Sequence, residues 1–140
     1  MKILLAVDGS AFTKRMLAWL AAHDEWRGAG NDYTVLHVVP ALPARASAVL
    51  DKKLLDDYYA EEVEAVFKPV RSFLAKQGLP VRFVAKTGHA VDVIAGQATK
   101  GKYDLLIMGS RGHGNLVNLV LGSVATRVMA QCKTPVLLIR

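Results

Sequence analysis

Cysteine is almost absent from this sequence, since Cys132 is the only one. A single cysteine cannot form an internal disulfide, so the chain is not a disulfide-stabilised scaffold and suits a reducing compartment. No apolar run approaches the length that a membrane-spanning helix needs. The first apolar run, Ile3–Val7, is cut by Asp8, which argues against a secretory signal peptide. These absences predict a cytoplasmic protein with no membrane contact.

Clustered basic charge is also scarce, although the formal net charge is +6. The lysines and arginines are scattered, and the only adjacent basic pairs are Lys14-Arg15 and Lys52-Lys53. Aromatic residues are not interleaved with the basic ones, as they are in proteins that bind single-stranded nucleic acid. Nucleic acid is therefore a disfavoured partner. A basic balance also suits a polyphosphate ligand.

Strand and helix patterns alternate along the chain. The first and fourth strand segments are apolar at nearly every position, which is typical of strands buried on both faces of a parallel sheet. The helix after Ser10 is closed by Gly28 and Gly30. The predicted strands are 1–7, 33–39, 79–86, 103–108 and 135–139, and the later helices are 49–77, 90–99 and 124–131.

This alternation implies right-handed crossovers and a parallel sheet with helices on both faces. We predict an α/β fold in a single domain, residues 1–140, with an open five-stranded sheet in the order 3-2-1-4-5. Ligands of such sheets bind beyond the carboxyl ends of the strands, where the strand order reverses.

Two regions carry further local predictions. The stretch from Pro40 to Ser47 holds two prolines and small residues, so we predict a loop near the ligand edge. Pro69 falls inside the helical pattern 49–77, where the missing backbone donor predicts a kink or a break. The acidic residues between 56 and 64 are read as the solvated face of this helix rather than as a metal site.

The most informative stretch follows the fourth predicted strand. Three glycines occur between residues 109 and 114, and Gly122 and Ser123 open the last helical pattern. Glycine lets backbone N–H groups turn towards a ligand, and a helix N-terminus carries partial positive charge. The spacing predicts a phosphate-binding loop, to which the hydroxyls of Ser110 and Ser123 add donors. The alternative is that these glycines only form turns.

Other nucleotide and catalytic signatures are missing. There is no Gly-x4-Gly-Lys-Ser/Thr, and no Gly-x-Gly-x-x-Gly follows the first predicted strand. No acid is placed to orient His113 as a base for Ser110 or Ser123. The sequence therefore supports nucleotide binding better than nucleotide turnover.

The chain resembles the universal stress protein family. The matching motifs are Gly109-x2-Gly112-x9-Gly122-Ser123 before a helix, the opening Lys2-Ile-Leu-Leu-Ala-Val-Asp8-Gly9-Ser10, and the terminal Pro135-Val-Leu-Leu-Ile139. The resemblance covers the whole chain and is looser between about Pro40 and Pro80. It implies a small Rossmann-like domain, of the adenine nucleotide alpha hydrolase-like kind, which dimerises. Members with this glycine motif intact bind ATP.

The resemblance also implies which residues would form the ATP site. The glycine loop would surround the ribose and phosphates, and the start of the last helix would hold phosphate oxygens. Asp8 would line the crevice, and Val38 would contact adenine. The residue pattern itself makes Asp8 the only carboxylate that is placed to help hold Mg²⁺. The implied site residues are Ala6, Asp8, Val38, Gly109, Ser110, Arg111, Gly112, His113, Gly114, Asn115, Gly122, Ser123, Val124 and Ala125.

Three functions stay open on the sequence. The first is an ATP-binding stress-response regulator, in which bound ATP biases conformation or partner choice. The second is an enzyme, a nucleotide hydrolase or transferase, slow or self-phosphorylating, that uses Asp8 and Ser123. The third is an interaction module without a ligand, whose glycines are structural. The terminal strand, 135–139, is apolar on both faces at a predicted sheet edge, so we expect a homodimer in which two such strands meet.

Overall fold

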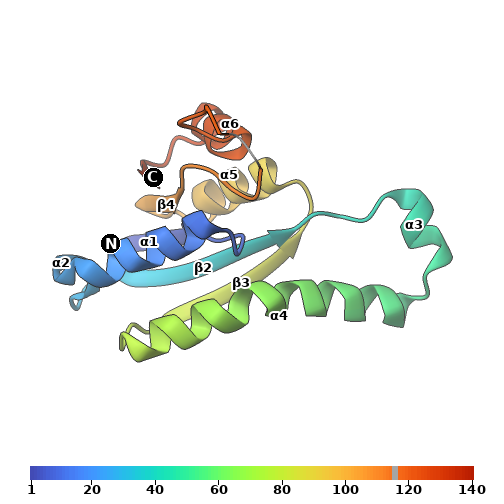
Figure 1. Cartoon of the computed structure of the whole chain (residues 1–140), viewed down its shortest axis with the longest axis horizontal. Helices are drawn as coiled ribbons and strands as arrows, with labels where there is room; N and C mark the ends of the chain where they lie inside the picture. The colour runs from blue at the N-terminus through green and yellow to red at the C-terminus, as the bar shows by residue number, and fades with distance from the viewer. Residues whose placement is uncertain (115–116) are drawn as a thin grey trace.

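A computed structural model, which describes residues 1–114 and 117–140, shows a parallel sheet between two layers of helices (Figure 1). The strands are β1 (Lys2–Ala6), β2 (Asp32–Val39), β3 (Val81–Thr87), β4 (Leu105–Gly109) and β5 (Val136–Ile139). The helices are α1 (Ala11–Ala22), α2 (Asp24–Arg27), α3 (Ala44–Val49), α4 (Lys52–Lys76), α5 (Ala90–Lys100) and α6 (Ser123–Gln131). No helix in the described ranges is long and apolar enough to cross a lipid bilayer.

The sheet order is β3-β2-β1-β4-β5 and every pair is parallel, which confirms the predicted topology. The order reverses between β1 and β4, because the chain moves outward from β1 to β3 and then crosses back. Ala6 pairs with Met108 across this reversal. The carboxyl ends of β1 and β4 therefore lie side by side, at the place where open α/β sheets bind ligands.

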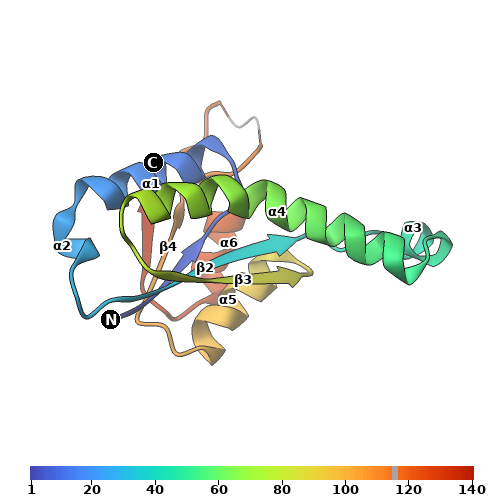
Figure 2. The ribbon, with the colours of Figure 1, turned by 90° about the horizontal axis from the view of Figure 1, so that it is seen from below.

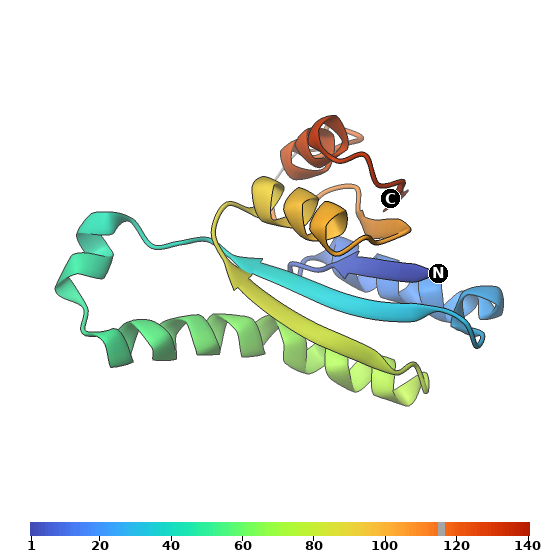
Figure 3. The same cartoon turned by 180° about the vertical axis from the view of Figure 1, so that it is seen from behind.

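Each face of the sheet has its own hydrophobic core. Ile3 and Leu5 point into the core under α1 and α4, whereas Leu4 points into the core under α5 and α6. Successive residues of a strand face opposite sides of the sheet, so a strand covered on both sides must be apolar at every position. Figure 3 shows the two helical layers on either side of the strands.

Helix α4 runs through Pro69 as one continuous helix, so the predicted break is wrong (Figure 2). Pro69 cannot donate to the carbonyl of Ala65, but both residues are exposed. Water can hydrate that carbonyl, while Phe67 and Val70 hold the buried side of the helix against the sheet. The first half of α4 and α3 project beyond the sheet in all three views.

Two other local predictions are corrected. The stretch 40–47 is not wholly a loop, because α3 begins at Ala44 and the Ser47 N–H donates to the carbonyl of Pro43 at 3.0 Å. The first helix does not reach Gly28. His23 ends it, since its ring Nδ1 bonds the Trp19 carbonyl at 2.7 Å, the acceptor that the next helical N–H would need.

Candidate functional site

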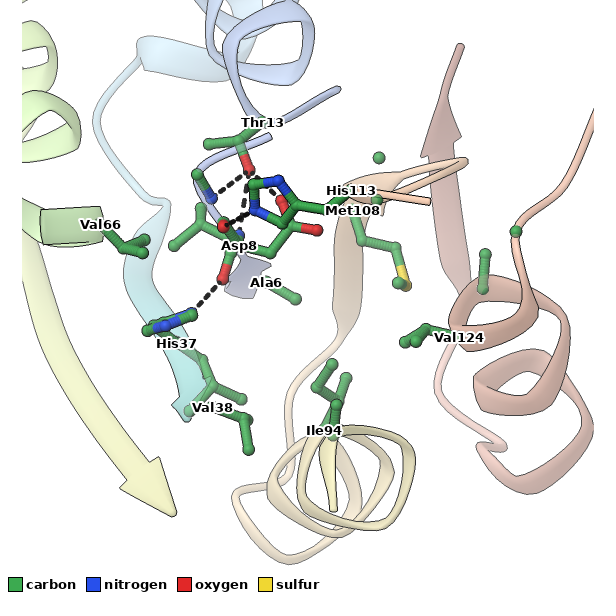
Figure 4. A pocket seen from close by; sticks show the side chains of 18 of the residues that line it. Ala6, Asp8, Thr13, His37, Val38, Val66, Ile94, Met108, His113 and Val124 are labelled. Carbon is green, nitrogen blue, oxygen red and sulfur yellow. Dashed lines mark hydrogen bonds between the residues drawn. The ribbon is translucent and has the colours of Figure 1, made fainter. Parts of the chain in front are cut away.

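A cavity of about 580 Å³ lies at the carboxyl ends of β1, β2 and β4, where the strand order reverses (Figure 4). The glycine loop after β4 and the first turn of α6 form one side of it. Most of the predicted site residues meet here. Those that line the cavity are Ala6, Asp8, Val38, Gly109, Arg111, Gly112, His113, Gly114, Gly122, Ser123, Val124 and Ala125.

Two of the predicted site residues are not among these. Ser110 is 1% exposed and lies outside the cavity wall. Its N–H donates to the Ile139 carbonyl at 2.8 Å, and its carbonyl accepts from the Gly122 N–H at 2.7 Å. Those bonds fix the Ser110 backbone between β5 and the turn before α6. Asn115 falls outside the described residues, so its role stays a prediction.

One wall of the cavity is apolar. Ala6, Val38 and Met108 come from three neighbouring strands, and Ile94 and Val124 face them from α5 and α6 (Figure 4). An apolar wall of this kind suits a flat ring such as a nucleobase. Sequence reasoning missed Ile94 and Met108 because an inward-facing apolar residue looks the same whether it borders a core or a cavity.

The turn after β1 is organised by Asp8 and Thr13. The Asp8 carboxylate Oδ1 accepts from the Ser10 N–H at 2.9 Å and from the Thr13 hydroxyl at 3.0 Å. The Thr13 hydroxyl oxygen in turn accepts from the N–H groups of Asp8 and Gly9, at 3.1 and 3.2 Å. Gly9 has a φ of +77°, a value that favours glycine. Thr13 was missed because it lies within the pattern of α1.

The glycine loop closes on this turn. A Cβ on Gly112 would lie 2.7 Å from Oδ2 of Asp8, so a side chain at this position forces a shift. His113 Nε2 lies 2.6 Å from the Asp8 carbonyl oxygen. A carbonyl can only accept, so Nε2 carries the proton and donates. His113 therefore fastens the loop to the end of β1.

Gly109 has a packing reason of its own. A Cβ there would lie 2.5 Å from the Cβ of Phe12 on α1. Close contact between α1 and β4 thus requires glycine whether or not a ligand binds. The turn-only alternative accounts for this glycine, but not for the donors described next.

The start of α6 presents unused backbone donors. Ser123, Val124 and Ala125 form its first turn, and their N–H groups have no hydrogen-bond partner within the described residues. The first intrahelical bond runs from the Thr126 N–H to the Gly122 carbonyl, at 3.0 Å. No side chain caps the helix. Adjacent N–H groups without a partner at the positive end of a helix are an arrangement that suits an anion.

The opposite rim comes from a region in which sequence reasoning named no site residue. Glu62 and Val66 of α4 line the cavity together with Pro40, which follows β2. His37 of β2 is buried there, and its Nδ1–H donates to the Val7 carbonyl at 2.8 Å. The stretch that begins at Pro40 was predicted to lie near the ligand edge, and Pro40 does line the cavity. The contribution of α4 was not predicted, because the motif signal is weak between residues 40 and 80.

An open parallel sheet with a cavity at its reversal point is the architecture of ligand-binding α/β domains. The sequence model of the universal stress protein family matches residues 1–140. The chain belongs to the universal stress protein family.

Individual relatives agree with this assignment. A universal stress protein from Thermus aquaticus is 32% identical over 139 residues, which cover 99% of this chain and 97% of that relative. A solved universal stress protein in complex with cAMP matches with a TM-score of 0.72 and 17% identity, covering 100% of this chain and 97% of that one. An Arabidopsis thaliana family protein with AMP bound matches with a TM-score of 0.70 and 20% identity, covering 99% and 90%. At these identities the two solved structures show a shared fold.

Proposed function

We propose that this protein binds ATP in the cavity between β1, β2 and β4, and that it acts as a stress-response regulator. The observation that carries the proposal is the first turn of α6, whose three residues line the cavity and whose N–H groups have no partner in the described chain. AMP and cAMP in complexes of two proteins with this fold support an adenine nucleotide as the ligand.

The cavity offers a different surface to each part of the nucleotide. Adenine would lie against the apolar wall at Val38 and Met108, and the ribose near Asp8. The phosphates would accept from the N–H groups of residues 123–125, close to the Arg111 side of the cavity. Backbone N–H donors bind the phosphates and do not distinguish one nucleobase from another. The apolar wall must therefore select the base.

Asp8 is the group that would hold Mg²⁺. Its Oδ1 is occupied by Ser10 and Thr13, while Oδ2 makes no hydrogen bond to the described residues. No cluster of three metal-binding side chains exists in the described ranges. One carboxylate oxygen together with phosphate oxygens and water is a set that Mg²⁺ accepts. When bound, the ion would neutralise phosphate charge.

Regulation fits this site because a bound nucleotide would touch several elements at once. The cavity joins the end of β2, the glycine loop and α6 with the base of the projecting α4. A ligand that contacts all of them stabilises one arrangement over others, and so alters the surface that partners meet. A cytoplasmic homodimer that pairs β5 with β5 belongs to the same proposal.

The test removes one backbone donor at the start of α6. Ser123 is the first helical residue, a position where proline is favoured, and Gly122 before it is extended at φ −77° and ψ 166°. Ser123→Pro therefore deletes one N–H and the hydroxyl, whereas Ser123→Ala deletes only the hydroxyl. Calorimetry should show that Ser123→Pro binds ATP at least about tenfold more weakly than Ser123→Ala does. The two variants should have similar thermal stability. Equal affinity in both variants would contradict the proposal.

A further inference from the structure

A second cavity, of about 230 Å³, lies next to the glycine turn. Ser110, Arg111, Arg140 and the segment 117–120 line it. Among the described residues, Arg111 alone borders both this cavity and the one proposed for ATP. The second cavity is therefore lined by residues of its own, and it shares only Arg111 with the proposed ATP site among the described residues.

The Ser110 hydroxyl is the first sign of a binding site. Its oxygen is fully buried and has no hydrogen-bond partner in the described chain. The backbone of this residue is fixed, because its N–H and its carbonyl are both bonded, to Ile139 and Gly122. A buried hydroxyl without a partner is destabilising, and native proteins usually supply one through protein, water or an ion.

The register of the sheet brings a cation to the same place. Gly109 pairs with Ile139, so the next residues along the two strands, Ser110 and Arg140, lie opposite each other. Neighbouring residues at one register position share a face of the sheet. Both residues line the cavity, so a cationic residue and the residue with the buried hydroxyl border the same space.

The surroundings add positive charge. The Arg111 guanidinium carbon lies 4.7 Å from the ring centre of Phe12, and the Arg15 guanidinium carbon lies at the same distance from that ring. No Asp or Glu side chain is found among the described residues that line the cavity. Arginines that line one cavity raise the local concentration of anions there.

We propose that this second cavity binds a tetrahedral oxyanion of the phosphate type, with Arg140 and the Ser110 hydroxyl as its donors. The guanidinium supplies paired N–H donors that match phosphate oxygens, and the hydroxyl gains the partner that it lacks. The anion is either free inorganic phosphate or the terminal phosphate of a nucleotide whose base lies in the first cavity. Both sources present the same phosphate oxygens to the cavity, and the experiment below distinguishes them.

The experiment follows backbone amide signals by NMR during a titration with inorganic phosphate at constant ionic strength. Saturable shifts are expected at residues 110, 119 and 140, and they should persist when the protein is saturated with AMP. If ATP abolishes these shifts and AMP does not, the terminal phosphate is the occupant. The proposal is overturned if no saturable shift occurs, or if the shifts lie only at 123–125 and vanish with AMP.

Matched variants locate the donors. Arg140→Gln should weaken phosphate binding about tenfold and leave AMP binding unchanged, whereas Arg127→Gln, on the exposed side of α6, should change neither. Ser110→Ala should weaken phosphate binding while raising the melting temperature in phosphate-free buffer, because it removes an unpartnered buried hydroxyl. Unchanged phosphate affinity in both Arg140→Gln and Ser110→Ala would refute the assignment. The phosphate titration needs no nucleotide, so it tests the second cavity even if ATP does not bind to the first.

Discussion

At the scale of single residues, Asp8 connects two loops that follow different strands. Its carboxylate accepts from Ser10 and Thr13 on the side of α1, and its carbonyl accepts from His113 on the side of β4. The proposed site thus depends on one short turn whose polar atoms are almost all engaged. Substitutions that touch this turn should affect ligand affinity and folding together.

The first prediction concerns Gly112. Gly112→Ala places a methyl group against Oδ2 of Asp8 and should lower stability by about 1–3 kcal/mol, as overpacking does, while weakening ATP binding. The control is Gly96→Ala on α5, where a Cβ meets nothing within 4 Å. That variant should gain about 0.5–1 kcal/mol and keep its ATP affinity. Chemical denaturation and calorimetry measure both effects. A Gly112→Ala variant with unchanged stability and affinity would show that the loop does not lie on Asp8.

The second prediction concerns Thr13. Thr13→Val keeps the shape of the side chain but leaves the N–H groups of Asp8 and Gly9 without their acceptor. We expect a loss of about 1–3 kcal/mol, measured by urea denaturation. Thr99→Val, at an exposed position on α5, should stay within about 0.5 kcal/mol of the wild type. Equal losses in the two variants would mean that the Thr13 hydroxyl does not stabilise the turn.

Sequence patterns predicted those site residues whose position depends on local spacing, and failed for those whose position depends on contacts between distant segments. Glycine spacing indicated the loop, and Gly109, Gly112 and Gly122 do line the cavity. The same spacing placed Ser110 at the ATP site, yet the bond from its N–H to Ile139 holds it outside the cavity wall. That bond joins residues from two strands, and no pattern within the loop reveals it.

At the scale of elements, the strands were the most predictable part of the chain. Burial on both faces makes β1 and β4 apolar at nearly every position, and glycines or polar residues mark where they end. The helices at the periphery were less predictable. Where these helices begin and end depends on side chains that compete with the backbone for hydrogen bonds. The His23 ring, for example, bonds the Trp19 carbonyl at the end of α1. Sequence periodicity does not record such contacts.

The third prediction concerns Pro69 in α4. Pro69→Ala restores a backbone donor to an exposed helical turn, so the variant should be more stable. The gain should be about 1–2 kcal/mol, since proline disfavours a helix interior by about 3 kcal/mol but also restricts the unfolded chain. The control is Pro80→Ala, just before β3, which restores no helical bond and should be neutral or slightly destabilising. Thermal melts that show no gain for Pro69→Ala would indicate that α4 relies on the proline for its shape.

At the scale of the whole molecule, the sheet has one apolar edge at β5. β5 is paired with β4 alone, and its residues Val136, Leu137 and Leu138 are only half-buried. The N–H groups of Leu106 and Ser110 donate to the carbonyls of Pro135 and Ile139. In a parallel strand the bonding direction alternates, so Val136 and Leu138 direct their backbone groups to the open edge. An edge of this kind suits a second copy of the chain.

The fourth prediction tests that pairing without a substitution. In a dimer joined through β5, the amide hydrogens of Val136 and Leu138 should exchange slowly at high protein concentration and faster on dilution. The Ser110 amide, bonded within one chain, should exchange at a rate that does not depend on concentration. Sedimentation that shows only monomer, together with fast exchange at both edge amides at every concentration, would rule out the dimer.

The central claim is that the first turn of α6 and the glycine loop receive the phosphates of a nucleotide. The most direct measurement is an NMR titration of the full chain with ATP and Mg²⁺, read at the backbone amides. The largest shifts should fall at residues 112–114 and 123–125, with smaller ones at Ala6 and Val38. An absence of saturable shifts at 123–125, with or without shifts elsewhere, would contradict the account.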